Sequence, residues 1–214
     1  MEASPPTPPP PPEPPAPPPP PPSATSGYPA RLDASRQEEY HRLLPLVKWL
    51  LAIPHLLVLI VLGIGAFFAG IIAFFAVLFT GAYPRGIWDY ITGVHRWGLR
   101  VGSYVLLLTD VYPPFSLEDD PNYPVRVEFD YPETIDRWRP LVQWLLAIPY
   151  LIVAGILFYV AEIVALIGVF VILFTKNLPE GMFKLILNPF RWQLRGNTYA
   201  YFLVTQYPPF EWDD

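Results

Sequence analysis

Residues 49–80 read WLLAIPHLLVLIVLGIGAFFAGIIAFFAVLFT, and residues 144–175 read WLLAIPYLIVAGILFYVAEIVALIGVFVILFT. Glu162 is the one Asp, Glu, Lys or Arg residue in these two apolar segments. A helix rises about 1.5 Å per residue, so either segment as one helix would be about 48 Å long, against about 30 Å for the hydrocarbon core of a bilayer. Each segment is therefore either a hairpin of two short helices or one long, tilted helix, kinked at Pro54 or Pro149.

The composition of the whole chain also favours a membrane protein. Of 214 residues, 52% are hydrophobic and 15% are charged, the mean hydropathy is +0.30, and there is no cysteine. Soluble domains usually carry about 25% charged residues. The missing cysteines exclude disulfides, thiolate metal sites and a cysteine nucleophile. The sequence begins without a basic stretch followed by an apolar one, so we expect the internal segments to direct insertion.

The beginning of the chain is dominated by proline. Residues 5–22 contain only proline apart from Thr7, Glu13 and Ala16. Proline fixes φ and donates no backbone hydrogen bond, so we expect an exposed polyproline II segment. This segment is either a disordered spacer, which we favour, or a ligand for a partner protein with an aromatic-lined groove. We therefore expect residues 1–27 to form a disordered tail.

The rest of the chain is an internal repeat. Residues 28–119 align with residues 123–214 without a gap, at an offset of 95 positions. The sequence thus predicts two homologous membrane modules of the same fold, residues 28–120 and residues 121–214. The best-matched blocks are Trp49–Pro54 with Trp144–Pro149, Leu78–Thr80 with Leu173–Thr175, Arg96–Arg100 with Arg191–Arg195, and Tyr112–Phe115 with Tyr207–Phe210.

The distribution of basic residues favours the hairpin. All lysines and arginines lie outside the two apolar segments. If each segment crosses the membrane twice, all of these residues fall on one side, in agreement with the positive-inside rule. The turns would then lie near Gly63–Gly65 and Tyr159–Glu162. We expect an all-α, multi-pass protein of the cytoplasmic (plasma) membrane with both termini in the cytoplasm, and one crossing per segment is the alternative.

Each module has shorter elements around its apolar segment. Residues 125–131 alternate apolar and polar side chains, which predicts a short strand or extended loop. Gly81 is a candidate left-handed cap after the first apolar segment. Residues 86–108 have an apolar face and a basic face, which predicts an amphipathic helix in the membrane interface, with Trp88 and Trp97 in an aromatic belt. The second module repeats this helix, and Pro189 should kink or shorten it.

Two pairs of arginines lie on these amphipathic helices, and two interpretations of them are open. They bind anionic lipid headgroups, or they pair with the acidic segments Glu118–Asp120 and Glu211–Asp214, which end the two modules. The arginines are Arg96 and Arg100 in the first module and Arg191 and Arg195 in the second.

The repeated blocks resemble a known family. WLLAIPH (49–55), LFTGAYPRGIWDYITGVHRWGLR (78–100) and LLTDVYPPFSL (107–117) are similar to the bacterial membrane-protein family catalogued as domain of unknown function 4389. The resemblance covers nearly all of residues 28–214 as two tandem copies, and it is looser in the second copy, at 176–178 and Pro189. It implies a membrane fold and location, and no activity.

No pattern typical of a catalytic or cofactor site is present in the sequence. The three histidines lie at no metal-ligand spacing, and phosphate-binding, dinucleotide-binding and hydrolase motifs are absent. Glu162 is either a functional residue at mid-bilayer or, as we favour, a hydrated residue at a hairpin tip. We expect a non-enzymatic structural or interaction protein without cofactor, metal or nucleic acid, which binds membrane lipids and presents its basic helices and proline-rich tail at the cytoplasmic face. The alternative is a small transporter or channel subunit that uses Glu162.

Overall fold

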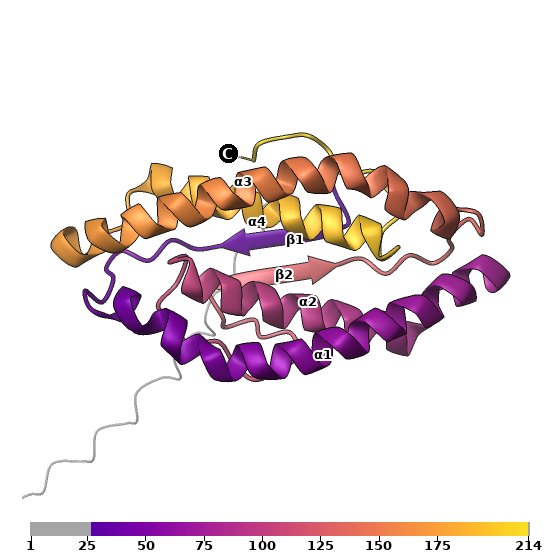
Figure 1. Ribbon diagram of the computed structural model, residues 1–214, viewed down its shortest axis with the longest axis horizontal. Coiled ribbons are helices and arrows are strands. Elements are labelled where there is room, and N and C mark those ends of the chain that lie inside the picture. The colour runs from indigo at the N-terminus through magenta and orange to yellow at the C-terminus, as the bar shows by residue number, and fades with distance from the viewer. Residues whose placement is uncertain (1–26, 214) are drawn as a thin grey trace, which may run out of the picture.

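The computed structural model describes residues 27–213. The predicted disordered tail lies outside the described residues, apart from Gly27. Each repeat contributes one strand, one long helix and one shorter helix, in the same order along the chain (Figure 1). The elements are β1 (Ala30–Ala34), α1 (Leu44–Thr80), α2 (Arg85–Val105), β2 (Val125–Phe129), α3 (Arg139–Thr175) and α4 (Glu180–Ala200).

The apolar segment of each repeat is one continuous helix of 37 residues. The predicted hairpin is therefore wrong, and the alternative of a single long helix is the one observed. Gly63 and Gly65, expected at a turn, lie within α1, and Gly81 is the one described glycine with a positive φ. A turn inside the apolar segment would leave backbone N–H and C=O groups without partners, whereas a continuous helix satisfies them along its length.

The ends of the elements follow from local sequence. α1 ends at Gly81, whose φ is 73° and whose N–H donates to the carbonyl oxygen of Val77 at 2.8 Å, as predicted for a left-handed cap. α3 ends in the same way at Lys176, with a φ of 57°. The predicted strand and amphipathic helix correspond to β2 and α2. α4 continues through Pro189 and is as long as α2, so this proline does not shorten the helix.

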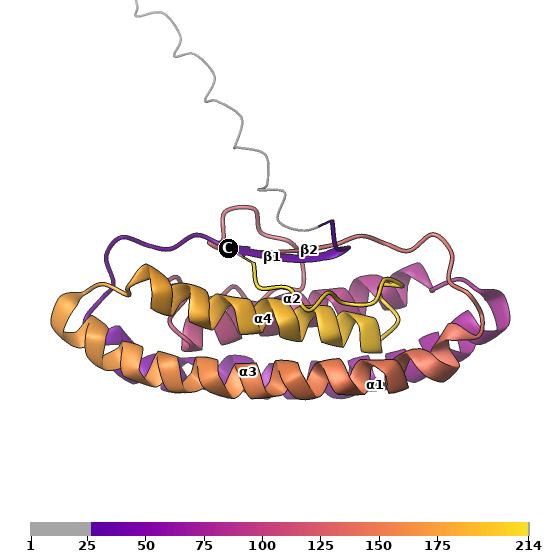
Figure 2. The same ribbon diagram turned by 90° about the horizontal axis from the view of Figure 1, so that it is seen from above.

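The elements form three layers (Figures 1 and 2). α1 and α3 run antiparallel in one outer layer and bow apart at their middles, α2 and α4 form the middle layer, and the strands lie on the far side of it. α2 packs against α1, and α4 packs against α3. Small buried side chains on the long helices let the short helices approach closely. These are Ala52, Ala66 and Ala73 on α1 and Ala147, Ala154 and Ala161 on α3.

The strands are exchanged between the two repeats. β1 precedes α1 in the chain but packs against α4, and β2 precedes α3 but packs against α2. The strands pair antiparallel, and Leu32 lies opposite Val127, its counterpart in the second repeat. An antiparallel pair centred on equivalent residues has a twofold axis perpendicular to the strands. The repeats are therefore related by a pseudo-twofold rotation, and both present their long helix to the same side of the molecule.

Candidate functional site

The outer sides of α1 and α3 form an exposed apolar surface, called the apolar face below. Most of the large apolar side chains that are exposed in the described residues belong to these two helices; Phe79 is 70% exposed and Phe174 is 75% exposed. Both helices are long and apolar enough to cross a membrane. In the most apolar 18-residue stretch of each, only 17% (α1) and 22% (α3) is buried in the protein. The core helix of a soluble protein would be mostly buried. Exposed apolar surfaces of this extent mark sites of membrane or protein contact.

The tryptophans on the apolar face differ from those predicted. Trp88 and Trp97, expected in an aromatic belt, are each only 5% exposed, because α2 is enclosed between α1 and the strand layer. Trp49 and Trp144 are exposed instead, and the indole N–H of each donates to the carbonyl oxygen three residues earlier. An indole whose N–H is satisfied within its own helix can lie in apolar or interfacial surroundings.

The polar side chains near the start of the long helices point inward. Lys48 is 1% exposed; its Nζ lies 2.7 Å from Asp110 Oδ1 and donates to the carbonyl oxygen of Thr109, also at 2.7 Å. Gln143 occupies the same position in the second repeat and donates to two backbone carbonyl oxygens, at 2.8 and 2.7 Å. One of these belongs to Val204, the counterpart of Thr109. Both repeats therefore use this position to satisfy carbonyl groups just beyond the short helix.

The repeated sequence motifs meet in one aromatic cluster per repeat. In the first repeat, His55 follows WLLAIP, Trp97 lies in the Arg-Trp block, and Phe115 ends YPPF. Trp97 Nε1 donates to His55 Nδ1 at 3.0 Å, and the imidazole stacks on Phe115 with 3.8 Å between ring centroids. The motifs thus hold each long helix to its short helix and to the segment after it. The counterparts in the second repeat are Tyr150, Trp192 and Phe210.

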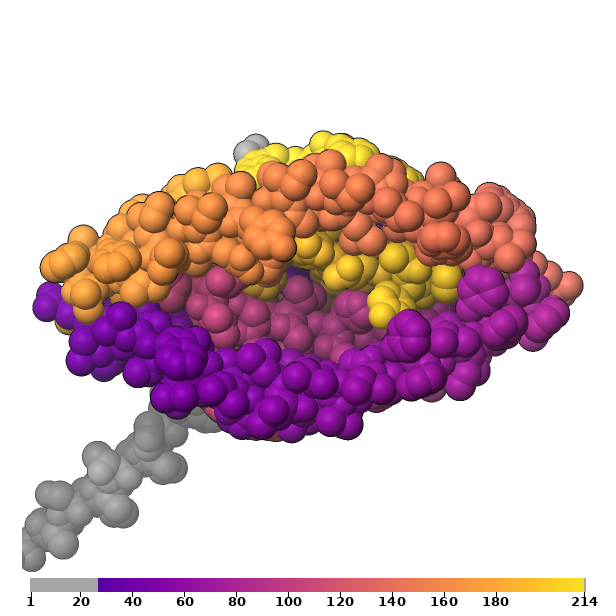
Figure 3. Space-filling view, in the orientation of Figure 1, coloured from indigo at the N-terminus to yellow at the C-terminus, as the bar shows by residue number. Residues whose placement is uncertain are grey.

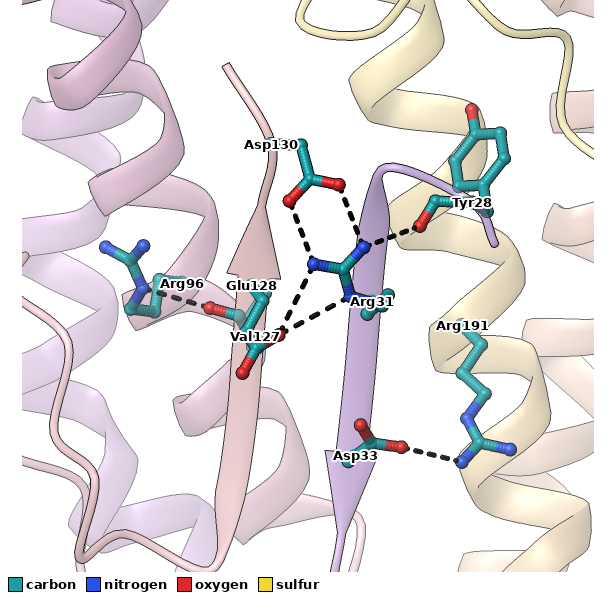
Figure 4. Close-up of polar contacts among 8 residues, drawn as sticks. All are labelled: Tyr28, Arg31, Asp33, Arg96, Val127, Glu128, Asp130 and Arg191. Atoms are coloured by element: carbon teal, nitrogen blue, oxygen red, sulfur yellow. Dashed lines mark hydrogen bonds and ion pairs between the residues drawn. The ribbon is translucent and has the colours of Figure 1, made fainter. Parts of the chain in front are cut away.

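Two of the predicted arginines reach the strands (Figure 4). Arg96 Nε donates to the carbonyl oxygen of Val127 at 3.3 Å. Arg191 Nε donates to that of Leu32, which the figure does not draw, at 2.9 Å. Leu32 and Val127 are the paired residues at the pseudo-twofold axis, so the two contacts are equivalent. Arg191 also lies 3.4 Å from Asp33 Oδ1. Each arginine fastens a helix of one repeat to the strand of the other, and we call these two contacts the strand clamps.

The other two predicted arginines contact the acidic segments. Arg100 is fully buried; its Nη1 donates to the carbonyl oxygen of Glu118 at 2.9 Å, and its Nη2 lies 3.4 Å from Asp119 Oδ1. Arg195 Nη2 lies 2.5 Å from Asp213 Oδ2. Burial lowers the pKa of Arg100, and the neighbouring Asp119 opposes this effect. The acidic segments are thus the observed neighbours of these arginines, while lipid headgroup binding stays a prediction.

The strand layer and the segments that flank it carry charged side chains. Arg31 on β1 lies 2.8 Å from Asp130 Oδ1 and 3.4 Å from Glu128 Oε2 (Figure 4). This layer is on the side of the molecule opposite the apolar face (Figure 2). Other exposed charged residues of the same segments are Arg36, Glu38, Glu133 and Arg137.

Glu162 is exposed on α3, within a continuous helix. The interpretation as a hairpin tip therefore fails together with the hairpin. Its counterpart on α1 is Phe67, and within residues 27–213 the Glu162 carboxylate forms no hydrogen bond or ion pair. In the same part of the chain, no group of three His, Cys, Asp or Glu side chains is placed to hold a metal ion. A functional role for Glu162 stays a prediction.

Comparison with known proteins identifies one family. The family described as domain of unknown function (DUF4389) matches residues 44–116 and again residues 137–211. The first match extends from the start of α1 to the YPPF motif, and the second covers the equivalent elements of the second repeat. No curated protein and no solved structure matches the chain.

Proposed function

The chain belongs to the DUF4389 family in two tandem copies, and we propose that it is a non-enzymatic membrane module whose apolar face lies in the hydrocarbon of a single leaflet. The strand layer then lies in water and is the side available to partners. The observation that carries this proposal is that α1 and α3 carry exposed apolar side chains, whereas the strand layer and its flanking segments carry exposed charged ones. These two layers form opposite broad sides of the molecule (Figure 2). A molecule with this separation can lie with its apolar side in one leaflet and its charged side in water.

The direction in which the strands run favours an arrangement with the axes of α1 and α3 parallel to the membrane plane. The strands run alongside α1 and α3 in both views (Figures 1 and 2). If α1 crossed the bilayer, the strand layer would lie at bilayer depth, together with the strand clamps and the pair of Arg31 with Asp130. One arginine at the bilayer centre costs about 2.5–3.5 kcal/mol on insertion scales. With the helix axes in the membrane plane, these charged groups lie on the water side.

The length of the long helices supports the same arrangement. A helix of 37 residues is about 55 Å long, so fitting it across a core of about 30 Å would need a tilt of about 57°. Crossing helices are usually tilted by about 0–40°. A helix lying in the plane has no such length limit.

The pseudo-twofold axis would then lie along the membrane normal. Both repeats would sit at the same depth and face the same way, which agrees with the repetition of WLLAIP in both. The lysines and arginines lie outside the apolar segments, so the positive-inside rule supports a cytoplasmic position for the strand layer and for the chain before β1 and after α4. These locations are parts of the proposal.

Labelling of single cysteines tests the orientation, and the native chain has no competing thiol. Leu43→Cys and Ala82→Cys place exposed thiols just before and just after α1, and Trp138→Cys and Asn177→Cys do the same for α3. A membrane-impermeant maleimide should label both ends of each helix from the same side of sealed vesicles. Labelling of the two ends from opposite sides would overturn the in-plane arrangement and restore the multi-pass one.

A transporter or channel subunit is the second candidate, because an exposed carboxylate lies in the middle of α3. This function requires crossing helices, so opposite-side labelling is its first condition. Its second condition is an ion flux in liposomes that Glu162→Gln abolishes, with Phe67→Gln as the matched change on α1.

A further inference from the structure

A hollow lies between α1 and α3 on the apolar face (Figure 3). The long helices form its rim, and α2 and α4 are visible at its floor. It contains a cavity of about 400 Å³ next to the end of α4 and a cavity of about 320 Å³ between α1, α2 and α4, and Tyr201 lines both. Small-molecule sites usually measure about 300–1,000 Å³. The hollow is therefore large enough to hold a ligand.

The walls of the hollow are almost entirely apolar. Aromatic side chains of α1, among them Phe67 and Phe74, line the larger cavity together with Trp144 of α3. Gly63 and Gly98 lie in the wall of the smaller cavity, and a Cβ added at either position would meet no atom within 4 Å. Among the described residues, no Asp, Glu, Lys or Arg side chain lines either cavity.

Three polar side chains line the smaller cavity. His95 Nδ1 lies 2.9 Å from the carbonyl oxygen of Ile91, so a neutral ring donates there and leaves Nε2 as an acceptor. Burial lowers the pKa of His95, which favours the neutral ring. The Asn197 amide and the Tyr201 hydroxyl have no hydrogen-bond partner within residues 27–213. Polar groups without partners are costly in apolar surroundings, so a bound molecule that hydrogen-bonds to them would be stabilised.

We propose that the hollow binds one uncharged single-chain lipid, with its hydroxyl or carbonyl oxygen at His95, Asn197 and Tyr201 and its apolar chain along the aromatic wall of α1. The hollow opens on the apolar face, which the proposed function places in hydrocarbon, so the inference rests on that function. An anionic head is disfavoured because, among the described residues, no lysine or arginine lines the cavities. A few convergent polar groups in an apolar pocket are typical of a site that orients its ligand.

Retinol is a suitable probe, because it carries one hydroxyl at the end of an apolar chain, and retinoic acid is its matched anionic probe. Binding is measured with the purified full chain in detergent, by energy transfer from tryptophan, of which Trp144 lines the hollow. We expect saturable binding of one retinol per chain, and binding of retinoic acid that is about tenfold weaker or more, since an unpaired carboxylate must be desolvated. Tighter binding of retinoic acid would overturn the choice of an uncharged lipid.

Glycine substitutions that fill the cavity should abolish ligand binding without lowering the stability of the protein. Gly63→Leu and Gly98→Leu fill the smaller cavity, and leucine is a better helix former than glycine, so we expect retinol binding to be lost without a lower melting temperature. Gly155→Leu on α3 is the control: its Cβ also meets no atom within 4 Å, it lines neither cavity, and binding should equal that of the wild type. Asn197→Leu should weaken retinol binding about tenfold.

Equal retinol binding by the wild type and Gly98→Leu would overturn this inference. Binding in detergent does not depend on orientation in a bilayer, so this result would leave the proposed function standing if both ends of each long helix are labelled from one side. Opposite-side labelling would instead refute the in-plane arrangement, whatever the binding result.

Discussion

Exchanging the residue types at the buried positions Lys48 and Gln143 should separate the contribution of charge to the free energy of unfolding from that of hydrogen bonding. The two residues occupy the same position in the two repeats, and both donate to backbone carbonyl groups beyond the short helix. Only Lys48 has a carboxylate beside it, because the counterpart of Asp110 in the second repeat is Thr205. Each repeat is therefore a natural control for the other.

Lys48→Ala removes both the cation and the hydrogen-bond donor. Removing one partner of a buried ion pair usually costs about 3–5 kcal/mol in the free energy of unfolding. Asp110 is 16% exposed and also accepts the backbone N–H of His41 at 2.7 Å, so we expect the lower value, about 3 kcal/mol. Lys48→Gln keeps a donor for the carbonyl of Thr109, as Gln143 does for its counterpart, and should cost only about 1–2 kcal/mol.

The reciprocal change places a charge where the chain has none. Gln143→Lys keeps the hydrogen bonds to carbonyl groups but buries an ammonium without a carboxylate, so we expect a loss of about 3 kcal/mol or more. The double variant Gln143→Lys/Thr205→Asp rebuilds the pair of the first repeat in the second and should regain at least about 1 kcal/mol.

Thermal unfolding of the purified protein in detergent measures these differences. For a chain of this size, about 1 kcal/mol corresponds to about 2–4 °C in melting temperature. Lys48→Ala should therefore melt about 6–12 °C below the wild type, and Lys48→Gln about 2–8 °C below it. Equal melting temperatures for Lys48→Ala and Lys48→Gln would refute the hydrogen-bond argument, and no recovery in the double variant would refute the electrostatic one.

Three further predictions concern the clamps, the aromatic cluster and the buried tyrosines. Arg96→Gln and Arg191→Gln together should speed hydrogen exchange of the β1 and β2 amides, because both strand clamps are lost; exchange equal to that of the wild type would contradict the clamps. Trp97→Phe removes the indole donor to His55 and should cost about 1 kcal/mol on thermal unfolding, and no loss of stability would contradict this bond. Burial raises the pKa of several tyrosines above the usual 10.0, so they stabilise the fold fully below pH 10 and lose this effect as pH rises further. The melting temperature should therefore fall above pH 10, and an unchanged value there would contradict this expectation. These tyrosines include Tyr28, Tyr40, Tyr83 and Tyr123.

Local features of the fold were predictable because they depend on neighbouring residues. The left-handed cap at Gly81, the strand or extended loop at 125–131 and the amphipathic helix α2 all follow from sequence patterns of a few residues, and the internal repeat follows from aligning the sequence with itself. The length of the apolar segments left both a hairpin and a single long helix open, and the distribution of basic residues favoured the hairpin. That preference was wrong because the positive-inside argument assumed that each segment crosses the bilayer, whereas a helix lying on one side of the membrane leaves all basic residues on that side and can have any length.

The environment of the charged residues could not be predicted in the same way. The basic side of α2 was assigned to the membrane surface, but the strand layer covers it, and Arg100 is fully buried. That layer depends on pairing between segments 95 positions apart, which no local pattern indicates. The sequence analysis also missed Asn197 as a residue that lines the hollow. The sequence does contain a signal, because the second repeat has this polar residue where the first repeat has the small Gly102.

The strand exchange has a consequence for the order in which the chain can assemble. During synthesis β1 emerges first, but the helix against which it packs, α4, emerges last. The N-terminal strand therefore stays without its partners until almost the whole chain has been made, and contacts of such long sequence separation slow folding. A chain truncated before α4 would keep β2 against α2 but would leave β1 without its helix. A single repeat made alone would also lack a helix against which its strand packs, and two copies could supply it to each other by exchanging strands.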